Sequence, residues 1–244
     1  MTLDGRVVLV TGGARRVGRA IALALAERRA RVAFSYRTSA REARGTLEAL
    51  QRLGAEALAV RADMSRAGEV RRLIERVGRR FGRLDVLINS AATFDRTPFG
   101  ALSERDWDRA LDANLKGPFL CALYASRLMR AHGGGKMINL ADWAGVRPYR
   151  DYLPYCVSKA GVLGLTRALA KELAPAIQVN AIAPGPMLPP AGMSRSARER
   201  IARRVPLGRW GSPQDIVNTV LFLIEGTDFM TGSTIFVDGG QLIA

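Results

Sequence analysis

The feature that most constrains this chain is a regular alternation of short apolar runs, rich in β-branched residues, with longer segments of helical periodicity. Runs that are apolar throughout are typical of strands covered on both faces, and their alternation with helices is typical of a parallel sheet built from βαβ units. Strands are predicted at 6–10, 31–36, 55–62, 84–89, 135–141, 177–184 and 234–240, and helices at 15–29, 39–53, 66–80, 103–131, 152–173 and 213–224.

The predicted fold is an α/β fold, a doubly wound seven-stranded parallel sheet with helices on both faces. The chain has 244 residues, with no linker-like stretch and no internal repeat, so a single domain over 1–244 is expected. No apolar run reaches the length of a membrane span and no signal-peptide pattern opens the chain, so we expect a cytoplasmic protein that does not bind membranes. Cys121 and Cys156 lack metal-ligand spacing and are interpreted as packing residues, so no metal site is predicted.

A formal net charge of +15 raises the question of nucleic-acid binding. Only four of the 37 basic residues are lysines, and the arginines are scattered over nearly every predicted helix instead of forming one tract. This distribution favours solvated helix faces, and no nucleic-acid partner is expected. The general positive field should still attract anionic small molecules.

In open α/β sheets, ligands bind beyond the carboxyl ends of the strands. The first predicted strand is followed by "TGGARRVG" (11–18), a glycine-rich turn that leads into a helix. The free N–H groups and the dipole at such a helix start favour a phosphate. Arg16 is unusual here, because a residue without Cβ allows the nearest approach of the backbone to a pyrophosphate.

The second strand end, "FSYRTS" (34–39), has no carboxylate to bind the ribose hydroxyls of NAD. Arg37 follows directly, with Ser35 and Ser39 as nearby donors, so a ribose 2′-phosphate would meet a guanidinium. The cofactor is therefore predicted to be NADPH, although Arg37 could also be one more surface arginine. Further along, Asp63 is expected to accept from the adenine amino group, and 88–92 to lie against a ribose, although simple strand caps would also explain both.

The segment 152–173 carries Tyr155 and Lys159, four residues apart on a helical pattern and therefore on one face. An ammonium close to a phenol stabilises its anion, so this tyrosine could pass a proton to a substrate as hydride arrives. Such a pair occurs often by chance. In the company of "TGGARRVG", "NSAA" (89–92), "DANLKG" (112–117) and "NAIAPGP" (180–186), it resembles the short-chain dehydrogenase/reductase family over essentially the whole chain.

The resemblance implies a Rossmann-type fold, a nicotinamide cofactor, a homotetramer, and a catalytic relay of Asn114, Tyr155 and Lys159, in which Asn114 keeps a water in place. It also implies that Pro184 and Gly185 line the nicotinamide pocket. The residues predicted to contact the cofactor are Gly12, Arg15, Arg16, Val17, Ser35, Tyr36, Arg37, Asp63, Met64, Asn89, Ser90, Ala91, Tyr155, Lys159, Pro184, Gly185 and Met187.

Two departures from the family pattern point to one branch. Most members have a serine thirteen residues before the tyrosine, where this chain has Asp142, and a glycine where it has Arg16. Both changes resemble the pteridine reductases, including the dihydromonapterin and dihydrofolate reductases of short-chain type. A carboxyl group beside Tyr155 can help to protonate a ring nitrogen, which a serine hydroxyl cannot.

The predicted substrate is accordingly a dihydropterin or dihydrofolate, held by Arg16, Phe94, Asp142 and Tyr155, with the ring between Phe94 and the nicotinamide. Phe94 could alternatively be a loop residue that closes over the core, and Trp143 could be pocket wall or packing. A flap over about 186–208, rich in Pro and Gly and then polar and helical, is expected to order over the ligands.

Two other functions remain open. The first is an NADPH-dependent carbonyl reductase of the 3-oxoacyl-carrier-protein type, against which Asp142 counts, because an ionised carboxylate opposes negative charge on a carbonyl oxygen. The second is a catalytically silent member that binds cofactor and a partner such as nucleic acid, against which the intact set of Asn114, Tyr155 and Lys159 counts.

Overall fold

Seven parallel strands form one sheet in the order β3-β2-β1-β4-β5-β6-β7. The computed structural model describes residues 1–189 and 192–244. The chain builds β1, β2 and β3 outward in one direction and then crosses back to place β4 beside β1, so the order reverses between β1 and β4. The strands are β1 (Val7–Thr11), β2 (Arg31–Tyr36), β3 (Ala57–Arg61), β4 (Val86–Asn89), β5 (Gly135–Leu140), β6 (Ile177–Pro184) and β7 (Thr234–Val237).

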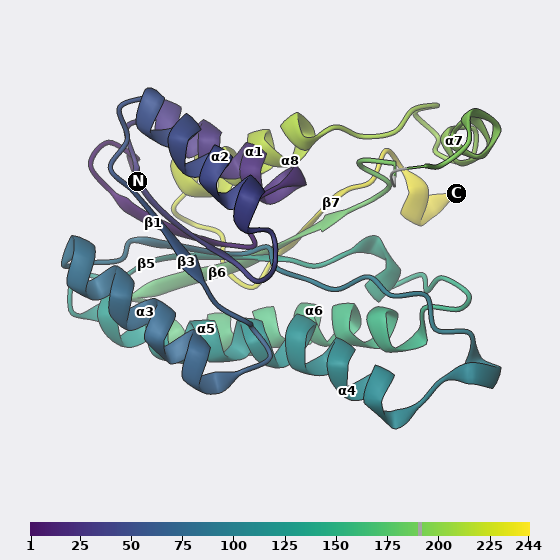
Figure 1. The fold of residues 1–244 in the computed structure, drawn as a ribbon, viewed down its shortest axis with the longest axis horizontal. Coiled ribbons are helices and arrows are strands. Elements are labelled where there is room, and N and C mark those ends of the chain that lie inside the picture. The colour runs from purple at the N-terminus through teal and green to yellow at the C-terminus, as the bar shows by residue number, and fades with distance from the viewer. Residues whose placement is uncertain (190–191) are drawn as a thin grey trace.

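Helices cover both faces of the sheet (Figure 1). One face carries α1 (Arg16–Glu27), α2 (Ala40–Arg52) and α8 (Pro213–Leu221), and the other carries α3 (Ala67–Phe81), α5 (Gly117–Arg130) and α6 (Leu153–Leu173), with α4 (Glu104–Leu111) beside α6. The short α7 (Arg195–Ala202) lies away from both layers, near the C-terminus. The predicted α/β doubly wound fold is confirmed.

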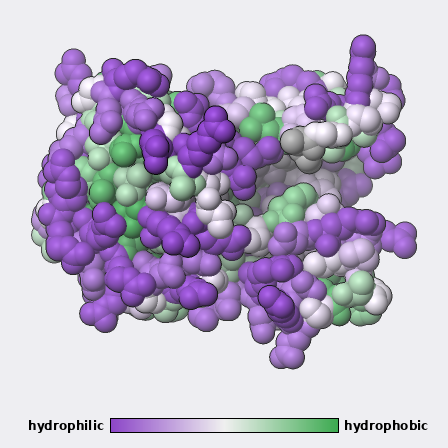
Figure 2. Space-filling model, viewed as in Figure 1, coloured by the Kyte–Doolittle hydropathy of each residue, from purple (hydrophilic) through white to green (hydrophobic). Residues whose placement is uncertain are grey.

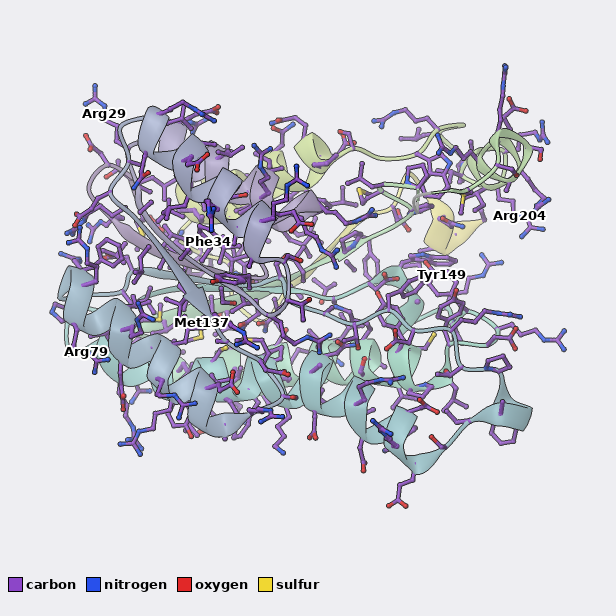
Figure 3. The ribbon with its side chains drawn as sticks, viewed as in Figure 1. Arg29, Phe34, Arg79, Met137, Tyr149 and Arg204 are labelled. Atoms are coloured by element: carbon purple, nitrogen blue, oxygen red, sulfur yellow. The ribbon has the colours of Figure 1, made fainter. Side chains whose placement is uncertain are left out.

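The strands are apolar throughout because successive side chains enter opposite layers. In β1, Val8 and Val10 pack into the core under α1 and α8, whereas Val7 and Leu9 pack into the core under α3 and α5. Phe34 in β2 points into the first layer, and Met137 in β5 points into the second (Figure 3). A strand with only one buried face would have shown alternation instead of a continuous apolar run.

The structure corrects the prediction of one continuous helix over 103–131. The structure divides it into α4, a π-helical segment η2 (Asp112–Lys116) and α5. Pro118 stands in the first turn of α5 and has no N–H to donate to the carbonyl of Asn114 four residues earlier, so a regular α-helical ladder cannot continue there. Hydrophobic periodicity does not register one extra residue per turn, which is why the pattern looked continuous.

Smaller differences concern the C-terminal end of another predicted helix and several short 3₁₀ turns. The helix predicted over 213–224 ends at Leu221 and continues as a second π-helical segment, η4 (Phe222–Gly226). Short 3₁₀ turns occupy η1 (Phe99–Ala101), η3 (Trp143–Gly145) and η5 (Gln241–Ile243). Within the described ranges, no helix combines the length and apolar character of a membrane span, and no group of three or more His, Cys, Asp or Glu side chains is placed to hold a metal ion.

Candidate active site

A cavity of about 860 Å³ opens at the carboxyl ends of the strands, visible as a hollow in the right half of Figure 2. It runs from the tip of β2 to the start of α6 and therefore spans the point where the strand order reverses. Most of the predicted site residues line it. These are Gly12, Arg15, Arg16, Val17, Ser35, Tyr36, Arg37, Asp63, Met64, Ser90, Ala91, Phe94, Asp142, Tyr155, Lys159, Pro184, Gly185 and Met187.

Asn89 is not among the residues that line the cavity. Its side-chain amide donates to Asn139 Oδ1 at 2.9 Å, and Asn139 in turn donates to Thr166 Oγ1 at 3.0 Å. All three side chains are buried. The carboxyl end of β4 therefore directs Asn89 into a polar chain across the sheet, and the cofactor contact predicted for this residue would have to come from its neighbours Ser90 and Ala91.

Asn114 also lies behind the cavity wall, although it belongs to the predicted relay. Its side chain accepts from Thr93 N at 2.8 Å and donates to Thr93 O and Ser158 Oγ, at 3.0 and 3.1 Å. These contacts tie η2 to the segment after β4 and to α6. π-Helical turns are frequent at functional sites, and Pro118 leaves the Asn114 carbonyl without its usual α-helical donor. The water-holding role predicted for Asn114 stays a prediction.

The turn after β1 packs its backbone closely against the segment after β4. Gly12 has a φ of +69°, and a Cβ built on it would lie 2.9 Å from Ala91 Cα. Thr11 Oγ1 accepts from the N–H groups of Ser90 and Ala91 at 3.0 and 3.1 Å, which fixes this turn against the end of β4. Together with the free N–H groups at the start of α1, this cradle fits the pyrophosphate of a dinucleotide.

Arg16 has a φ of +52°, a left-handed conformation that ordinarily favours glycine. Its guanidinium Nη2 donates to the Leu188 carbonyl at 2.8 Å, so it joins the turn after β1 to the segment after β6. The backbone at this position therefore has a conformation that suits glycine, although the side chain is that of arginine. The predicted contacts of Arg16 with phosphate and substrate stay predictions.

At the tip of β2, Arg37 faces Asp63 across the cavity end, with 4.0 Å between Nη1 and Oδ2. Burial alone would raise the pKa of Asp63, but hydrogen bonds from the Ser65 amide and hydroxyl and the charge of Arg37 hold that pKa below its ordinary value. Ser35 differs from the expectation that it is a donor to a 2′-phosphate. Its hydroxyl is buried and accepts from Gly12 N at 3.2 Å, so it shapes the glycine turn.

The reacting end is built by β5 and α6. Tyr155 and Lys159 project from the same face of α6, and Tyr155 Oη donates to Asp142 Oδ2 at 2.6 Å. Asp142 is the N-cap of η3, and its Oδ1 accepts from Ala144 N at 2.8 Å. Lys159 Nζ donates to the Leu140 carbonyl at 2.6 Å and lies 5.8 Å from the centroid of the Tyr155 ring. The carboxyl group at the usual serine position is therefore in direct contact with the tyrosine.

The electrostatics of this group correct one expectation. Burial raises the pKa of Tyr155 well above its ordinary value, and the negative charge of Asp142 raises it further, so Lys159 does not produce the lowered phenol pKa expected from the sequence. Burial also raises the pKa of Asp142, against hydrogen bonds from Tyr155 and Ala144 that favour the ionised form. Burial lowers the pKa of Lys159 to about 8. The Asp142 carboxyl and the Tyr155 phenol are therefore coupled through one short hydrogen bond at the cavity wall.

An aromatic wall, defined as Phe94, Tyr149, Tyr152 and Trp143, completes the cavity. Phe94 is 52% exposed and stacks on Tyr152, with 4.5 Å between ring centroids and 13° between planes. A ring cannot enter a gap of this width, so a flat ligand would have to use the other face of Phe94. Trp143 is buried and lines the cavity, so it serves as both wall and packing.

Tyr149 and Tyr152 were missed in the sequence. The signal that could have found them is the tyrosine spacing in "PYRDYLPY" (148–155), where three tyrosines recur every three residues ahead of and at the start of α6. The described part of the segment predicted as a flap supplies Met187, Leu188, Met193, Ile201 and Arg204 to the opposite wall. Figure 3 shows Tyr149 and Arg204 at the same end of the molecule. Pro190 and Ala191, within the same prediction, lie outside the described residues, and closure of the flap stays a prediction.

Comparisons with known proteins agree with this geometry. The family model described as "Enoyl-(Acyl carrier protein) reductase" matches residues 12–241. A 3-oxoacyl-[acyl-carrier-protein] reductase from Staphylococcus aureus is 39% identical over 237 residues, which cover 96% of each chain. A solved short-chain dehydrogenase/reductase from Serratia marcescens superposes with a TM-score of 0.93 at 31% identity, over 99% of this chain and 100% of that one.

The chain belongs to the short-chain dehydrogenase/reductase family. It shares with that family an oxidoreductase architecture in which the cavity, the glycine turn and the Tyr155–Lys159 pair occupy one edge of the sheet. A metagenomic blue fluorescent protein solved in complex with NADPH is also similar to it, with a TM-score of 0.90 and 31% identity over 99% of each chain. Asp142 and Arg16, the two positions at which the sequence is expected to depart from the family pattern, both line the cavity.

Proposed function

We propose that this short-chain dehydrogenase/reductase is an NADPH-dependent reductase whose proton donor is the Asp142–Tyr155 pair. The observation that carries the proposal is the 2.6 Å hydrogen bond between these two side chains at the inner wall of the cavity. NADPH is favoured over NADH because Arg15 and Arg37 line the outer end and no acid stands at the tip of β2. When bound, the nicotinamide supplies a hydride.

The site chemistry favours a C=N bond in a flat nitrogen heterocycle, which is the reaction of a pteridine reductase. Reduction of a C=N bond to CH–NH needs one hydride on carbon and one proton on nitrogen. Asp142 has a raised pKa through burial and contacts the Tyr155 hydroxyl, so the pair can take up a proton and present it at Tyr155 Oη. The outward face of Phe94 and the guanidinium of Arg16 would bind the ring.

A second candidate is reduction of a 3-oxoacyl thioester. It is favoured by the relatives, since the Staphylococcus aureus protein at 39% identity carries that name and none of the relatives described above is named for pterins. In this case the same pair would protonate a carbonyl oxygen. Asp142 argues against it when the group is ionised, because a carboxylate beside Tyr155 would oppose negative charge on that oxygen.

The roles of the other residues follow from their contacts. Lys159, fixed by the Leu140 carbonyl, places a positive charge beside the Tyr155 ring and within reach of a nicotinamide ribose. The Asn114 carbonyl would hold a water behind Lys159. The homotetramer and a pterin or folate as the physiological substrate stay predictions.

The two candidates are separated by following NADPH oxidation with dihydrobiopterin, dihydrofolate and an acetoacetyl thioester in turn. We expect turnover of the dihydropterin, and we expect Asp142→Ser to lower its kcat/KM by about 100-fold, because an acid group is removed from the proton path. The Kd for NADPH should change less than about twofold, since Asp142 lies beside the substrate end. Turnover of the thioester alone, maintained or increased in Asp142→Ser, would establish the second candidate.

A further inference from the structure

The arginines that line the cavity fall into two groups. Arg15, Arg16 and Arg37 follow β1 and β2, at the end where the phosphates of a dinucleotide would bind. The other two, Arg150 and Arg204, come from the loop before α6 and from the segment after α7. Phosphate binding at the first end gives no reason for the second pair.

Arg150 lies on a loop that is fastened close to the reacting tyrosine. On one side of it, the Tyr149 amide donates to Cys156 Sγ at 3.3 Å, and Cys156 follows Tyr155 directly in α6. On the other side, the Asp151 carbonyl accepts from a backbone amide of the segment after β4 at 2.7 Å. The Arg150 side chain therefore lines the cavity from a backbone that is held at both neighbours.

Arg204 lines the cavity from a different segment, at the same end of the molecule as Tyr149 (Figure 3). The next residue, Val205, is buried against the C-terminal tail, since a Cβ on Gly239 would lie 2.5 Å from Val205 Cγ1. Further along this tail, the Gln241 carbonyl accepts from a guanidinium of the loop after η3 at 3.3 Å. The tail therefore connects the segment that carries Arg204 to the loop that carries the other arginine.

The protein does not neutralise these two guanidinium groups. The acids nearest to them along the chain pair with other arginines, Asp151 with Arg96 at 2.7 Å and Glu199 with Arg195 at 2.8 Å. The two acids that line the cavity contact an arginine at the cofactor end and the reacting tyrosine. In the part of the chain that the structure describes, the second pair of cavity arginines thus has no carboxylate partner, and their charge favours an anionic ligand.

We propose that Arg150 and Arg204 bind an anionic group, a carboxylate or a phosphate, on the tail of a substrate whose reacting part lies against Tyr155. The inference rests on the proposed reductase function and narrows its substrate class to molecules with a negatively charged tail. A carboxylate or phosphate offers several acceptor positions, so one such group can accept from two guanidinium groups. Folate-type heterocycles carry carboxylates, and phosphopantetheine thioesters carry a phosphate, so both candidate reactions have a substrate of this kind.

The test compares ligands that differ in the charge of the tail. Folate is compared with its dimethyl ester, and acetoacetyl phosphopantetheine with acetoacetyl pantetheine, by isothermal titration calorimetry of the protein saturated with NADP⁺. We expect the charged member of one pair to bind about tenfold more tightly than its uncharged partner. The pair that shows this preference identifies the anion as a carboxylate or a phosphate. Equal affinities within both pairs would overturn the proposal.

Arg150→Gln and Arg204→Gln each remove one charge from the cavity, and Arg203→Gln is the matched control. Arg203 is exposed and adjacent in the chain, but it is not among the residues that line the cavity. We expect the preference to fall to about threefold in each single variant, to be lost in the double variant, and to stay at about tenfold in Arg203→Gln. The uncharged ligands should bind all variants with a Kd within about twofold of the wild type, which also checks that the variants fold.

Two results with these variants would overturn the proposal. An unchanged preference in the double variant would show that other groups bind the anion. An equal loss in Arg203→Gln would assign the preference to the general positive charge of the molecule.

Binding to the NADP⁺ complex separates this inference from the proposed function, because NADP⁺ has no hydride to transfer. A preference that depends on both arginines would support the anion site, even if no tested substrate is reduced. Turnover of a dihydropterin without any preference for a charged tail would support the reductase and overturn the anion site.

Discussion

Arg16 combines an arginine side chain with a backbone conformation that ordinarily favours glycine. A left-handed conformation costs an L-residue about 1–2 kcal/mol, and glycine avoids that cost. The chain retains arginine at a φ of +52° and uses its guanidinium to reach the Leu188 carbonyl across the cavity. The arginine at position 16 is therefore better explained by the contact it makes at the cavity than by a gain in stability.

We predict that Arg16→Gly changes the free energy of unfolding by less than about 1 kcal/mol, because relief of the backbone conformation offsets the lost hydrogen bond and the greater chain entropy of glycine. The KM for the heterocyclic substrate should rise about tenfold. Arg29→Gly is the matched control, since Arg29 also has a positive φ, +61°, but lies on the far side of the molecule from Tyr149 and Arg204 (Figure 3). An unchanged KM in Arg16→Gly would remove Arg16 from the substrate site.

Among the elements, β5 carries a buried lysine that secures the end of η4. Lys136 Nζ donates to the carbonyls of Leu223 and Ile224, at 3.1 and 2.9 Å, and to that of Thr227, and it pairs with Asp228 at 2.7 Å. The last carbonyls of a helix have no partner within the helix. An ammonium with three donors is suited to this place, and it links the sheet to the end of the α8 layer.

We predict that Lys136→Met lowers the free energy of unfolding by about 3 kcal/mol, because buried carbonyls lose their donor. Urea denaturation measures this change. Lys116→Met is the control, since Lys116 makes an exposed ion pair with Asp112 one helical turn away, and its loss should cost less than about 0.5 kcal/mol. Equal costs for the two variants would contradict the role given to Lys136.

For the whole molecule, positively charged side chains outnumber negatively charged ones where the ligand enters. The cavity is lined by five arginines and Lys159 but by only two acids, Asp63 and Asp142, within a chain of net charge +15. Figure 2 shows hydrophilic residues over most of this face, with apolar ones inside the hollow. A cleft lined by one sign of charge raises the association rate of ligands of the opposite sign.

We predict that the association rate constant of NADPH falls about tenfold between about 0.05 M and 0.5 M NaCl, because salt screens the field that draws the phosphates in. Stopped-flow fluorescence measures the rate. The dissociation rate constant should change much less, because the bound phosphates are held at short range. An association rate that does not respond to salt would show that the positive charge is unrelated to cofactor capture.

The sequence by itself determined the α/β order, the seven parallel strands and the edge of the sheet where the site lies. Apolar runs and helical periodicity are local consequences of burial, so they can be read residue by residue. The sequence could also predict the proximity of Tyr155, Lys159 and Asp142, because it depends on one helix and the strand end before it. The sequence could not predict the break in the helix at Asn114, since a π-helical turn leaves the hydrophobic pattern almost unchanged.

Only the tertiary structure decided which side chains face one another. It turned Asn89 and the Asn114 side chain away from the cavity, assigned Ser35 to the glycine turn, and joined Trp143 to Tyr149 in the cavity wall. It also placed Tyr155 where burial and the neighbouring Asp142 charge raise the pKa of its phenol. Desolvation and hydrogen-bond direction depend on atoms from several segments at once, and no single stretch of sequence contains that information.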